Sequence, residues 1–270
     1  MKINLFDSHV HSDNSHDGGN SVLFICDKAR ENRLMGLCIT DHFECDTPNV
    51  DEAMQAIKQS LFEAELANTT YGMQVRITKG IELGQPYAHP DVAEKALSLG
   101  KYDFVIGSAH GITDGTDLCL LDFNRPDIVV TEVLEDYYKC CVKLAKWNGF
   151  DCLAHLGYPE RYIWGKCRIP VNIEPYRDLI DEILNTLIDN GKALEINTSG
   201  LRTIGKTIPD MSIIKRYREL GGELITLGSD AHYAEHLAYG FDDTMDQLLK
   251  LGFRYFTVYR NREPLMLRIL

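Results

Sequence analysis

The sequence predicts an α/β fold in which seven parallel strands close into one distorted barrel. Seven apolar, strand-like runs alternate with helical patterns along the chain, which is typical of a parallel sheet covered by helices. Histidine or carboxylate residues follow these runs, and only a closed barrel brings the C-terminal ends of all its strands around one pocket. The 270 residues are 44% hydrophobic. We therefore expect a single domain over residues 1–270.

Each strand is predicted from a short apolar run that ends at polar or turn residues. The expected strands are Ile3–Asp7, Gly36–Thr40, Val75–Glu82, Tyr102–Ser108, Phe150–Ala154, Ala193–Asn197 and Glu223–Ser229. A further run, Phe253–Tyr259, predicts an additional strand outside this count.

Helical patterns occupy the segments between the strands, and several of them end at Gly or Asn, which commonly terminate helices. The expected helices are Val22–Arg33, Asp51–Ala67, Pro90–Leu99, Pro126–Trp147, Glu174–Asn190, Pro209–Leu220 and Ala234–Leu251. The chain thus has seven strand–helix steps rather than the eight of a regular barrel, which predicts the distortion.

The formal net charge of −12 disfavours a nucleic-acid groove, because an acidic surface repels a phosphodiester backbone. The N-terminus enters a predicted strand without a targeting pattern, and no uncharged apolar run approaches the roughly 18 residues of a membrane span. We expect a cytoplasmic protein with a small-molecule substrate and no membrane partner. The eight cysteines form no CxxC pair, so we expect reduced, mostly buried thiols.

Candidate metal ligands begin at the first strand. His9 and His11 are two residues apart, and since side chains alternate along a strand, both imidazoles can reach one metal ion. An isolated pair at this spacing is about as often two surface histidines, but the preceding Asp7 and the strand-end position favour ligation. Asp17 is a candidate in the following polar loop, where a turn role is the ordinary alternative for both it and His16.

Further candidates close the next strands. His42 follows Asp41, whose carboxylate is suited to orienting an imidazole. Glu82 ends an apolar strand between two glycines, and its two oxygens can each bind one cation, although a solvated loop position is commoner for Glu. His110 and His155 repeat the strand-end placement, where a lone histidine would more often be a hydrogen-bonded structural residue.

Asp230 and His232 complete the series, with the same two-residue spacing as the first pair. Nine candidates at one end of the predicted barrel are hard to explain as independent accidents. Imidazole and carboxylate ligands together bind zinc, manganese or iron. The nine candidates are His9, His11, Asp17, His42, Glu82, His110, His155, Asp230 and His232.

In these motifs the chain resembles the polymerase and histidinol phosphatase (PHP) superfamily, and within it the stand-alone histidinol-phosphate phosphatases. The resemblance covers essentially the whole chain. It implies a distorted (β/α)7 barrel that holds two to three divalent cations (Zn, Mn or Fe) at the C-terminal ends of its strands. The motifs that carry it are His9-Val10-His11, Thr40-Asp41-His42, Gly80-Ile81-Glu82, Gly107-Ser108-Ala109-His110, Ala154-His155-Leu156-Gly157-Tyr158, Leu194-Glu195-Ile196-Asn197-Thr198-Ser199-Gly200-Leu201-Arg202 and Asp230-Ala231-His232.

The resemblance also implies three ligand sets. The first cation would be bound by His9, His11, Glu82 and Asp230. Glu82 would bridge to a second cation, bound also by His110 and His155. The third would be bound by Asp17, His42 and His232. Some family members have histidine where Asp17 stands, which favours a weaker third site or one tuned toward a harder metal such as manganese.

The implied activity is hydrolysis of a phosphate monoester by attack of a metal-bridging hydroxide. Glu82, Asp230 and His232 are the expected catalytic residues, with Asp230 or His232 carrying a proton near the leaving oxygen. Arg161 and Arg202 are expected to bind the phosphate, because a guanidinium pairs with its oxygens bidentately, although a solvated loop arginine is about as common.

Three functions remain open from the sequence. The leading one is hydrolysis of L-histidinol phosphate to L-histidinol and phosphate in histidine biosynthesis. A second is a related phosphoesterase for another small monoester or a nucleotide, or a polymerase-type exonuclease, which the acidic charge disfavours. The third, a non-catalytic metal-binding barrel, ranks last because every expected ligand position holds a competent ligand.

Overall fold

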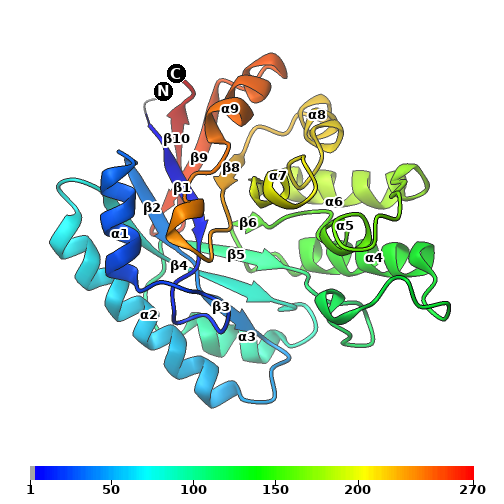
Figure 1. Cartoon of the computed structure of the whole chain (residues 1–270), viewed down its shortest axis with the longest axis horizontal. Helices are drawn as coiled ribbons and strands as arrows, with labels where there is room; N and C mark the ends of the chain where they lie inside the picture. The colour runs from blue at the N-terminus through cyan, green and yellow to red at the C-terminus, as the bar shows by residue number, and fades with distance from the viewer. Residues whose placement is uncertain (1–3) are drawn as a thin grey trace.

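The computed structural model describes residues 4–270, and its centre is a barrel of parallel strands (Figure 1). The strands neighbour one another in the order β1-β2-β4-β5-β6-β7-β8, and a short strand β3 pairs with β4 beside this path. All of these pairings are parallel. The bounds are β1 Phe6–Val10, β2 Gly36–Ile39, β3 His42–Glu44, β4 Arg76–Gly84, β5 Phe104–Ser108, β6 Cys152–Leu153, β7 Ala193–Asn197 and β8 Ile225–Gly228.

The first and last strands of this path meet and nearly close the barrel. The closure lies just beyond the end of β8, where the backbone N–H of Asp230 donates to the carbonyl of His9 (2.9 Å) and that of His11 donates to the carbonyl of Ala231 (2.9 Å). Because this seam is short, the barrel closes at its C-terminal rim rather than along whole strands. The expected distorted (β/α)7 barrel is confirmed.

Helices follow the strands and surround the barrel (Figure 1). Strands β1, β2, β5, β7 and β8 are buried at every residue, as a sheet covered by helices requires. Short helical turns stand between several strand ends and the next long helix. The bounds are α1 Val22–Glu31, α2 Val50–Tyr71, α3 Pro90–Leu97, η1 Leu118–Leu120, α4 Val130–Trp147, α5 Glu160–Ile163, η2 Glu174–Tyr176, α6 Arg177–Asp189, α7 Ser199–Thr203, α8 Met211–Glu219, η3 Ala234–His236 and α9 Phe241–Lys250.

Helix α4 illustrates why these segments are helical. Its buried residues recur every three or four positions, at Leu134, Tyr137, Cys141 and Leu144, and so form one apolar stripe. The helix ends at Asn148, which has a left-handed backbone (φ 60°), a common helix terminator. The stripe packs into the main hydrophobic core, which lies between the helices and the barrel.

Several expected elements differ from the structure in their bounds, and two of these differences matter most. The first strand is Phe6–Val10 rather than Ile3–Asp7, so it contains His9; Ile3 lies outside the described residues. The expected helix Ala234–Leu251 is present only in part, as η3 and α9, because Ala238 (φ 51°) and Gly240 (φ 71°) separate the two. The N–H of Ala238 donates to the buried carboxylate of Asp7 (2.8 Å), which holds the chain in this non-helical path.

A C-terminal hairpin follows the barrel. The expected strand 253–259 is present as β9 (Tyr255–Arg260), and it pairs antiparallel with β10 (Glu263–Arg268), which the sequence analysis did not predict. The hairpin turn, Asn261–Arg262, has positive φ at both residues, as a two-residue turn between antiparallel strands requires. Over residues 4–270, no helix has the length and apolarity needed to cross a bilayer, and all eight cysteines are free thiols.

Candidate metal centre

Four side chains meet where β1, β4 and β8 end, and we call them the first cluster. Glu82 Oε2 lies 3.2 Å from His9 Nε2 and 3.4 Å from His11 Nε2. Asp230 Oδ1 lies 3.8 Å and 3.4 Å from the same two nitrogens. Ligand bonds of about 2.0–2.2 Å in a tetrahedral site place ligand atoms roughly 3.3–3.6 Å apart. The four atoms therefore have the spacing of a metal-ligand set.

The second cluster lies on the other oxygen of the same glutamate. Glu82 Oε1 is 2.9 Å from His155 Nε2 and 3.3 Å from His110 Nε2, and the two nitrogens are 3.4 Å apart. Ser108 Oγ also donates to this oxygen. The Glu82 carboxylate thus presents one oxygen to each cluster, which is the arrangement of a bridging ligand.

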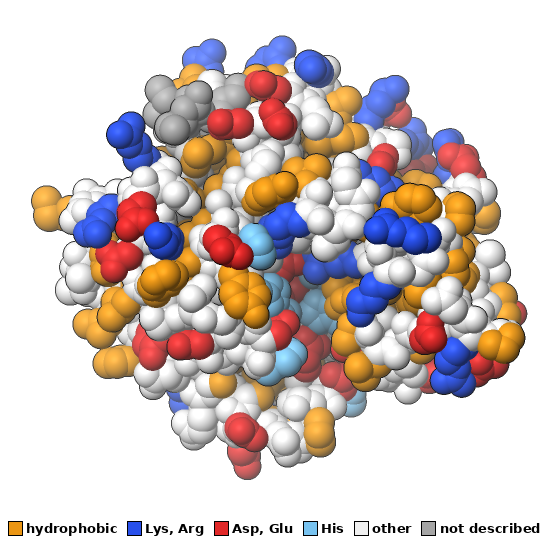
Figure 2. Space-filling model, in the orientation of Figure 1, with side chains coloured by type: hydrophobic (Ala, Val, Ile, Leu, Met, Phe, Trp, Pro, Cys, Tyr) orange, Lys and Arg blue, Asp and Glu red, His pale blue; other side chains and the backbone are white. Residues whose placement is uncertain are grey.

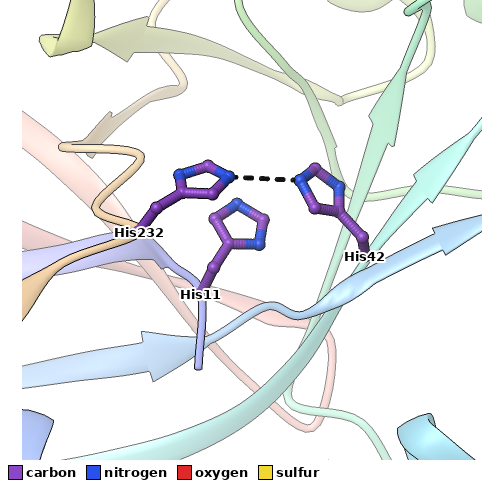
Figure 3. Close-up of side chains that lie close together, drawn as sticks. All are labelled: His11, His42 and His232. Atoms are coloured by element: carbon purple, nitrogen blue, oxygen red, sulfur yellow. Dashed lines mark hydrogen bonds between the residues drawn. The ribbon is translucent and has the colours of Figure 1, made fainter. Parts of the chain in front are cut away.

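The third cluster contains Asp17, His42 and His232. His232 Nε2 lies 3.0 Å from Asp17 Oδ2, and His42 Nε2 lies 3.8 Å from Asp17 Oδ1 and 3.4 Å from His232 Nε2. Figure 3 shows the His42 and His232 rings converging beside His11, whose ring stacks on both at 4.1 and 4.2 Å between centroids. His16 has a side chain that is 75% exposed, so Asp17 is the residue of this loop that faces the cluster.

The buried atoms of these clusters fit a metal. Within residues 4–270, His9 Nε2, His11 Nε2 and Glu82 Oε2 are buried and make no hydrogen bond. A buried polar atom without a partner is costly, and most native proteins avoid it. A divalent cation between these three atoms would satisfy them together, so the residues present suit a metal-binding role.

The two carboxylates at the centre are held ionised. Burial alone raises the pKa of Glu82, but the neighbouring imidazoles of His9 and His42 bring it well below its ordinary value. Burial likewise raises the pKa of Asp230, and the Arg161 guanidinium and His9 bring it well below its ordinary value. Both groups are therefore anionic, which is the form in which a carboxylate binds a cation.

The imidazoles divide into two kinds. Burial lowers the pKa of His9 and of His110, but facing carboxylates, led by Glu195 for His9 and by Glu44 for His110, raise both well above the ordinary value. For His11, burial and the nearby imidazoles both lower the pKa. The metal-free centre thus holds protons on some imidazoles and not on others.

Two carboxylates behind the clusters contact cluster imidazoles. Glu44 Oε1 lies 2.8 Å from His110 Nδ1, and Glu195 Oε1 lies 2.6 Å from His9 Nδ1. The sequence analysis missed Glu44, although it is two residues after His42 and thus on the same side of a strand. Carboxylates in this position fix the tautomer and orientation of a metal-binding histidine.

Asp41 has a different role from the one its position suggests. Its carboxylate accepts hydrogen bonds from the hydroxyls of Ser12 (2.7 Å), Ser15 (2.7 Å) and Ser60 (2.6 Å), and no histidine among residues 4–270 bonds to it directly. Ser15 Oγ in turn lies 3.3 Å from His11 Nδ1. Asp41 therefore acts on an imidazole through a serine rather than by direct contact.

A cavity of about 340 Å3 opens over the second and third clusters. Figure 2 shows histidine side chains at the bottom of a hollow in this face, with Lys or Arg side chains beside them. Besides cluster residues, the lining contains one guanidinium and three phenol rings. These additional lining residues are Tyr158, Arg161, Tyr162 and Tyr233.

The two candidate arginines differ in position. Arg161 lines the cavity, and its Nη2 donates to Ser199 Oγ (2.6 Å) and to Asp230 Oδ2. Arg202 donates to the backbone carbonyls of Ser229 (3.1 Å) and Asp230 (3.3 Å), and it is not among the residues that line this cavity. Arg161 is therefore placed to meet a ligand in the cavity, whereas Arg202 supports the loop that carries Asp230; phosphate binding by Arg202 stays a prediction.

The chain is similar to known proteins over most of its length. The PHP domain family model matches residues 7–199. The chain is 33% identical to a probable histidinol-phosphatase of Thermotoga maritima, over 94% of the chain and 95% of the relative. It is 26% identical to the histidinol-phosphatase of Lactococcus lactis, over 92% of the chain and 91% of the relative.

The fold is also similar to that of a solved structure. The crystal structure of histidinol phosphate phosphatase from Lactococcus lactis, in complex with Zn, L-histidinol and phosphate, aligns with a TM-score of 0.75 at 23% identity. The alignment covers 97% of this chain and 98% of that one. The chain therefore belongs to the PHP domain family and is similar over nearly its whole length to histidinol-phosphatases.

Proposed function

We propose that this enzyme hydrolyses L-histidinol phosphate to L-histidinol and phosphate, in the cytoplasm and as a step of histidine biosynthesis. The observation that carries the proposal is the Glu82 carboxylate, which presents one oxygen to each of two histidine clusters beside a cavity that contains a guanidinium. The names of the relatives support the substrate. We further propose that residues 1–270 act as one domain, since the clusters draw on side chains from residue 9 to residue 232.

We propose that the three clusters bind two to three divalent cations, Zn, Mn or Fe. The first would be held by His9, His11, Glu82 and Asp230. The second would be held by Glu82, His110 and His155. The third would be held by Asp17, His42 and His232. When bound, such cations supply Lewis acidity, which activates water and neutralises charge on the phosphoryl oxygens.

The chain's own residues would orient the substrate and handle the leaving group. Arg161 faces the cavity and can donate to the phosphoryl oxygens, while its bond to Asp230 fixes the plane of the guanidinium. Both expected proton carriers line the cavity, but Asp230 is held ionised, so His232 is the better candidate. In a centre that holds two cations, where the third cluster is free of metal, His232 would donate the proton that the departing alkoxide needs.

The cavity suits the alcohol portion of a small substrate. Its volume of about 340 Å3 is in the range of small-molecule pockets. Tyr158, Tyr162 and Tyr233 offer ring faces on which an imidazole can stack and over which an ammonium group can lie. A cavity of this kind favours a compact cationic monoester over a polymer.

The direct test is phosphate release from L-histidinol phosphate, compared with a panel of other monoesters and nucleotides. The enzyme would be stripped of metal and reloaded with Mn, Zn or Fe. We expect metal-dependent turnover with a clear preference for L-histidinol phosphate in kcat/KM. Faster turnover of another ester would reassign the substrate. No turnover of any ester with any of the metals would favour a non-catalytic barrel.

A further inference from the structure

Strand β7 gives no side chain to the three clusters, although it lies between β6 and β8, after which His155 and Asp230 are placed. Two polar residues near its C-terminal end, Glu195 and Asn197, are 1% and 0% exposed. They are two residues apart and therefore face the same side of the strand. Buried polar groups in such a place need partners, and here the partners are cluster residues.

We propose that Glu195 is a positioning residue that holds His9 and His155 in the orientation in which each binds a cation. Its Oε1 lies 2.6 Å from His9 Nδ1, and its Oε2 accepts a hydrogen bond from the backbone N–H of His155 (2.8 Å). One carboxylate thus contacts the first and the second cluster. This inference rests on the proposed metal binding, but not on the identity of the substrate.

Glu195 is too deep to contact a substrate. Its side chain is 1% exposed and does not line the cavity. The imidazole of His9 lies between it and the first cluster, because Nδ1 faces Glu195 while Nε2 faces Glu82 and Asp230. Binding of a cationic substrate group by Glu195 is therefore disfavoured.

The carboxylate selects one tautomer of His9. An ionised carboxylate only accepts hydrogen bonds, so the nitrogen that faces it must carry the proton. Nδ1 of His9 then stays the N–H, and Nε2 is the nitrogen that presents a lone pair toward Glu82 and Asp230 once a cation displaces its proton. This is the tautomer that a metal ion at the first cluster requires.

At His155 the carboxylate acts on the backbone. His155 has a φ of 22°, in a region that residues other than glycine rarely adopt. Glu195 holds its N–H, and the Tyr137 hydroxyl donates to its carbonyl (3.4 Å) and accepts from the N–H of Gly157 (3.0 Å). The turn that aims the His155 ring at Glu82 is thus fixed from both sides.

Two neighbours fit this role of Glu195. Asn197 Nδ2 donates to Glu195 Oε2 (3.0 Å) and to Asp230 Oδ2 (3.2 Å). The same network therefore also reaches Asp230 of the first cluster. Gly228 on β8 leaves room for the carboxylate, because a Cβ there would overlap Glu195 Oε1 and lie 2.6 Å from His9 Cβ. The chain therefore keeps a space for Glu195 at the seam between β7, β8 and β1.

The test is binding of Co2+ to the metal-free full chain, by chelator competition and by the visible absorption of the bound ion. Glu195→Gln keeps the shape but adds an NH2 donor, which must face either the Nδ1–H of His9 or the N–H of His155. We expect about 10- to 100-fold weaker Co2+ binding at the first two clusters and an altered visible spectrum. Binding at the third cluster should be unchanged, because its residues make no contact with Glu195.

A matched control separates positioning from general loss of structure. Asp151 is also a buried carboxylate, but it lies at the opposite end of the barrel, where it accepts from the N–H of Val105 and pairs with Arg262. Asp151→Asn should lower the melting temperature and leave Co2+ affinity and spectrum unchanged. Native affinity and spectrum in Glu195→Gln, or an equal change in Asp151→Asn, would overturn the proposal.

A second variant tests the inference if Glu195→Gln does not fold. Gly228→Ala keeps the carboxylate but displaces it, so it should also weaken Co2+ binding, and native binding in this variant contradicts the inference. Strong Co2+ binding in the native chain without turnover of L-histidinol phosphate would remove the proposed substrate and leave the role of Glu195 intact. A native chain that binds no Co2+ would refute the clusters and, with them, this inference.

Discussion

Glu82 distinguishes this centre from three separate groups of histidines. Its two oxygens face different clusters, and the imidazoles of five histidines lie within 3.5 Å of one or the other. A single residue therefore couples the first and second clusters. We therefore expect substitutions that remove a contact with Glu82 to affect activity differently from substitutions that leave all of these contacts in place.

The first prediction concerns His110, whose ring contacts Glu82 on one side and Glu44 on the other. His110→Ala removes an expected ligand of the second cluster, and we expect more than about 100-fold lower kcat with a melting temperature within a few degrees of the native value. His16→Ala is the matched control, because His16 is a largely exposed histidine beside the centre, and it should keep native activity. Substantial activity of His110→Ala in metal-replete buffer would contradict the assigned cluster.

The second prediction is that metal binding releases protons. The pKa of His9 and of His110 is raised above the ordinary value of 6.5, so both stay protonated in the metal-free protein at pH values somewhat above 6.5. A cation must displace these protons, so its apparent affinity should rise as pH increases from 6.5 through the raised pKa values. Calorimetric titration with Zn at pH 7, in buffers of different ionisation enthalpy, measures the protons released. His110→Ala should release fewer, and proton uptake would refute the prediction.

At the scale of strands and helices, the sequence predicts those elements that a local hydrophobic pattern determines. Apolar runs that end in His, Asp or Glu locate most of the barrel strands, and all nine candidate residues lie together at one end of the barrel. Strand β3 has only three residues, too short for a periodic signal, so Glu44 was missed with it. The break before α9 depends on a contact between Ala238 and Asp7, 231 residues away, which no local pattern contains.

The C-terminal hairpin leads to the third prediction. Its turn residue Arg262 pairs with the buried Asp151 through two nitrogens, at 3.0 and 2.8 Å, and thereby ties β9 and β10 to the start of β6. Arg262→Ala leaves that carboxylate without its counter-charge. Removing one partner of a fully buried pair costs about 3–5 kcal/mol. The Arg262 side chain is 36% exposed, so we expect a smaller loss, roughly 1–3 kcal/mol in the free energy of unfolding.

Urea denaturation of the metal-free protein measures this loss, and Arg125→Ala is the matched control. Arg125 also contacts an aspartate, Asp127, through two nitrogens, but both side chains are 61% exposed. Its removal should change the free energy of unfolding by no more than about 0.5 kcal/mol. Equal effects of the two substitutions would show that the hairpin is not held by the Asp151 pair.

At the scale of the whole molecule, the first cluster joins the two ends of the barrel. His9 and His11 come from β1 and its end, and Asp230 follows β8, so the cluster spans the short seam where the barrel closes. Few backbone hydrogen bonds cross this seam, and the unpartnered atoms His9 Nε2 and His11 Nε2 lie beside it. A cation bound there would cross-link residues more than 200 positions apart in the sequence.

The fourth prediction follows from that cross-link. A ligand that binds only the folded state stabilises it by about 2.7 kcal/mol when present at 100 times its dissociation constant. Removal of metal should therefore lower the melting temperature by several degrees, measured by circular dichroism with and without Zn. Hydrogen exchange should increase most at the N–H groups of His11 and Asp230, which form the seam, and least in β4 and β5, which pair along five residues. Uniform exchange across the barrel on metal removal would mean that the cation stabilises the fold as a whole rather than by closing this seam.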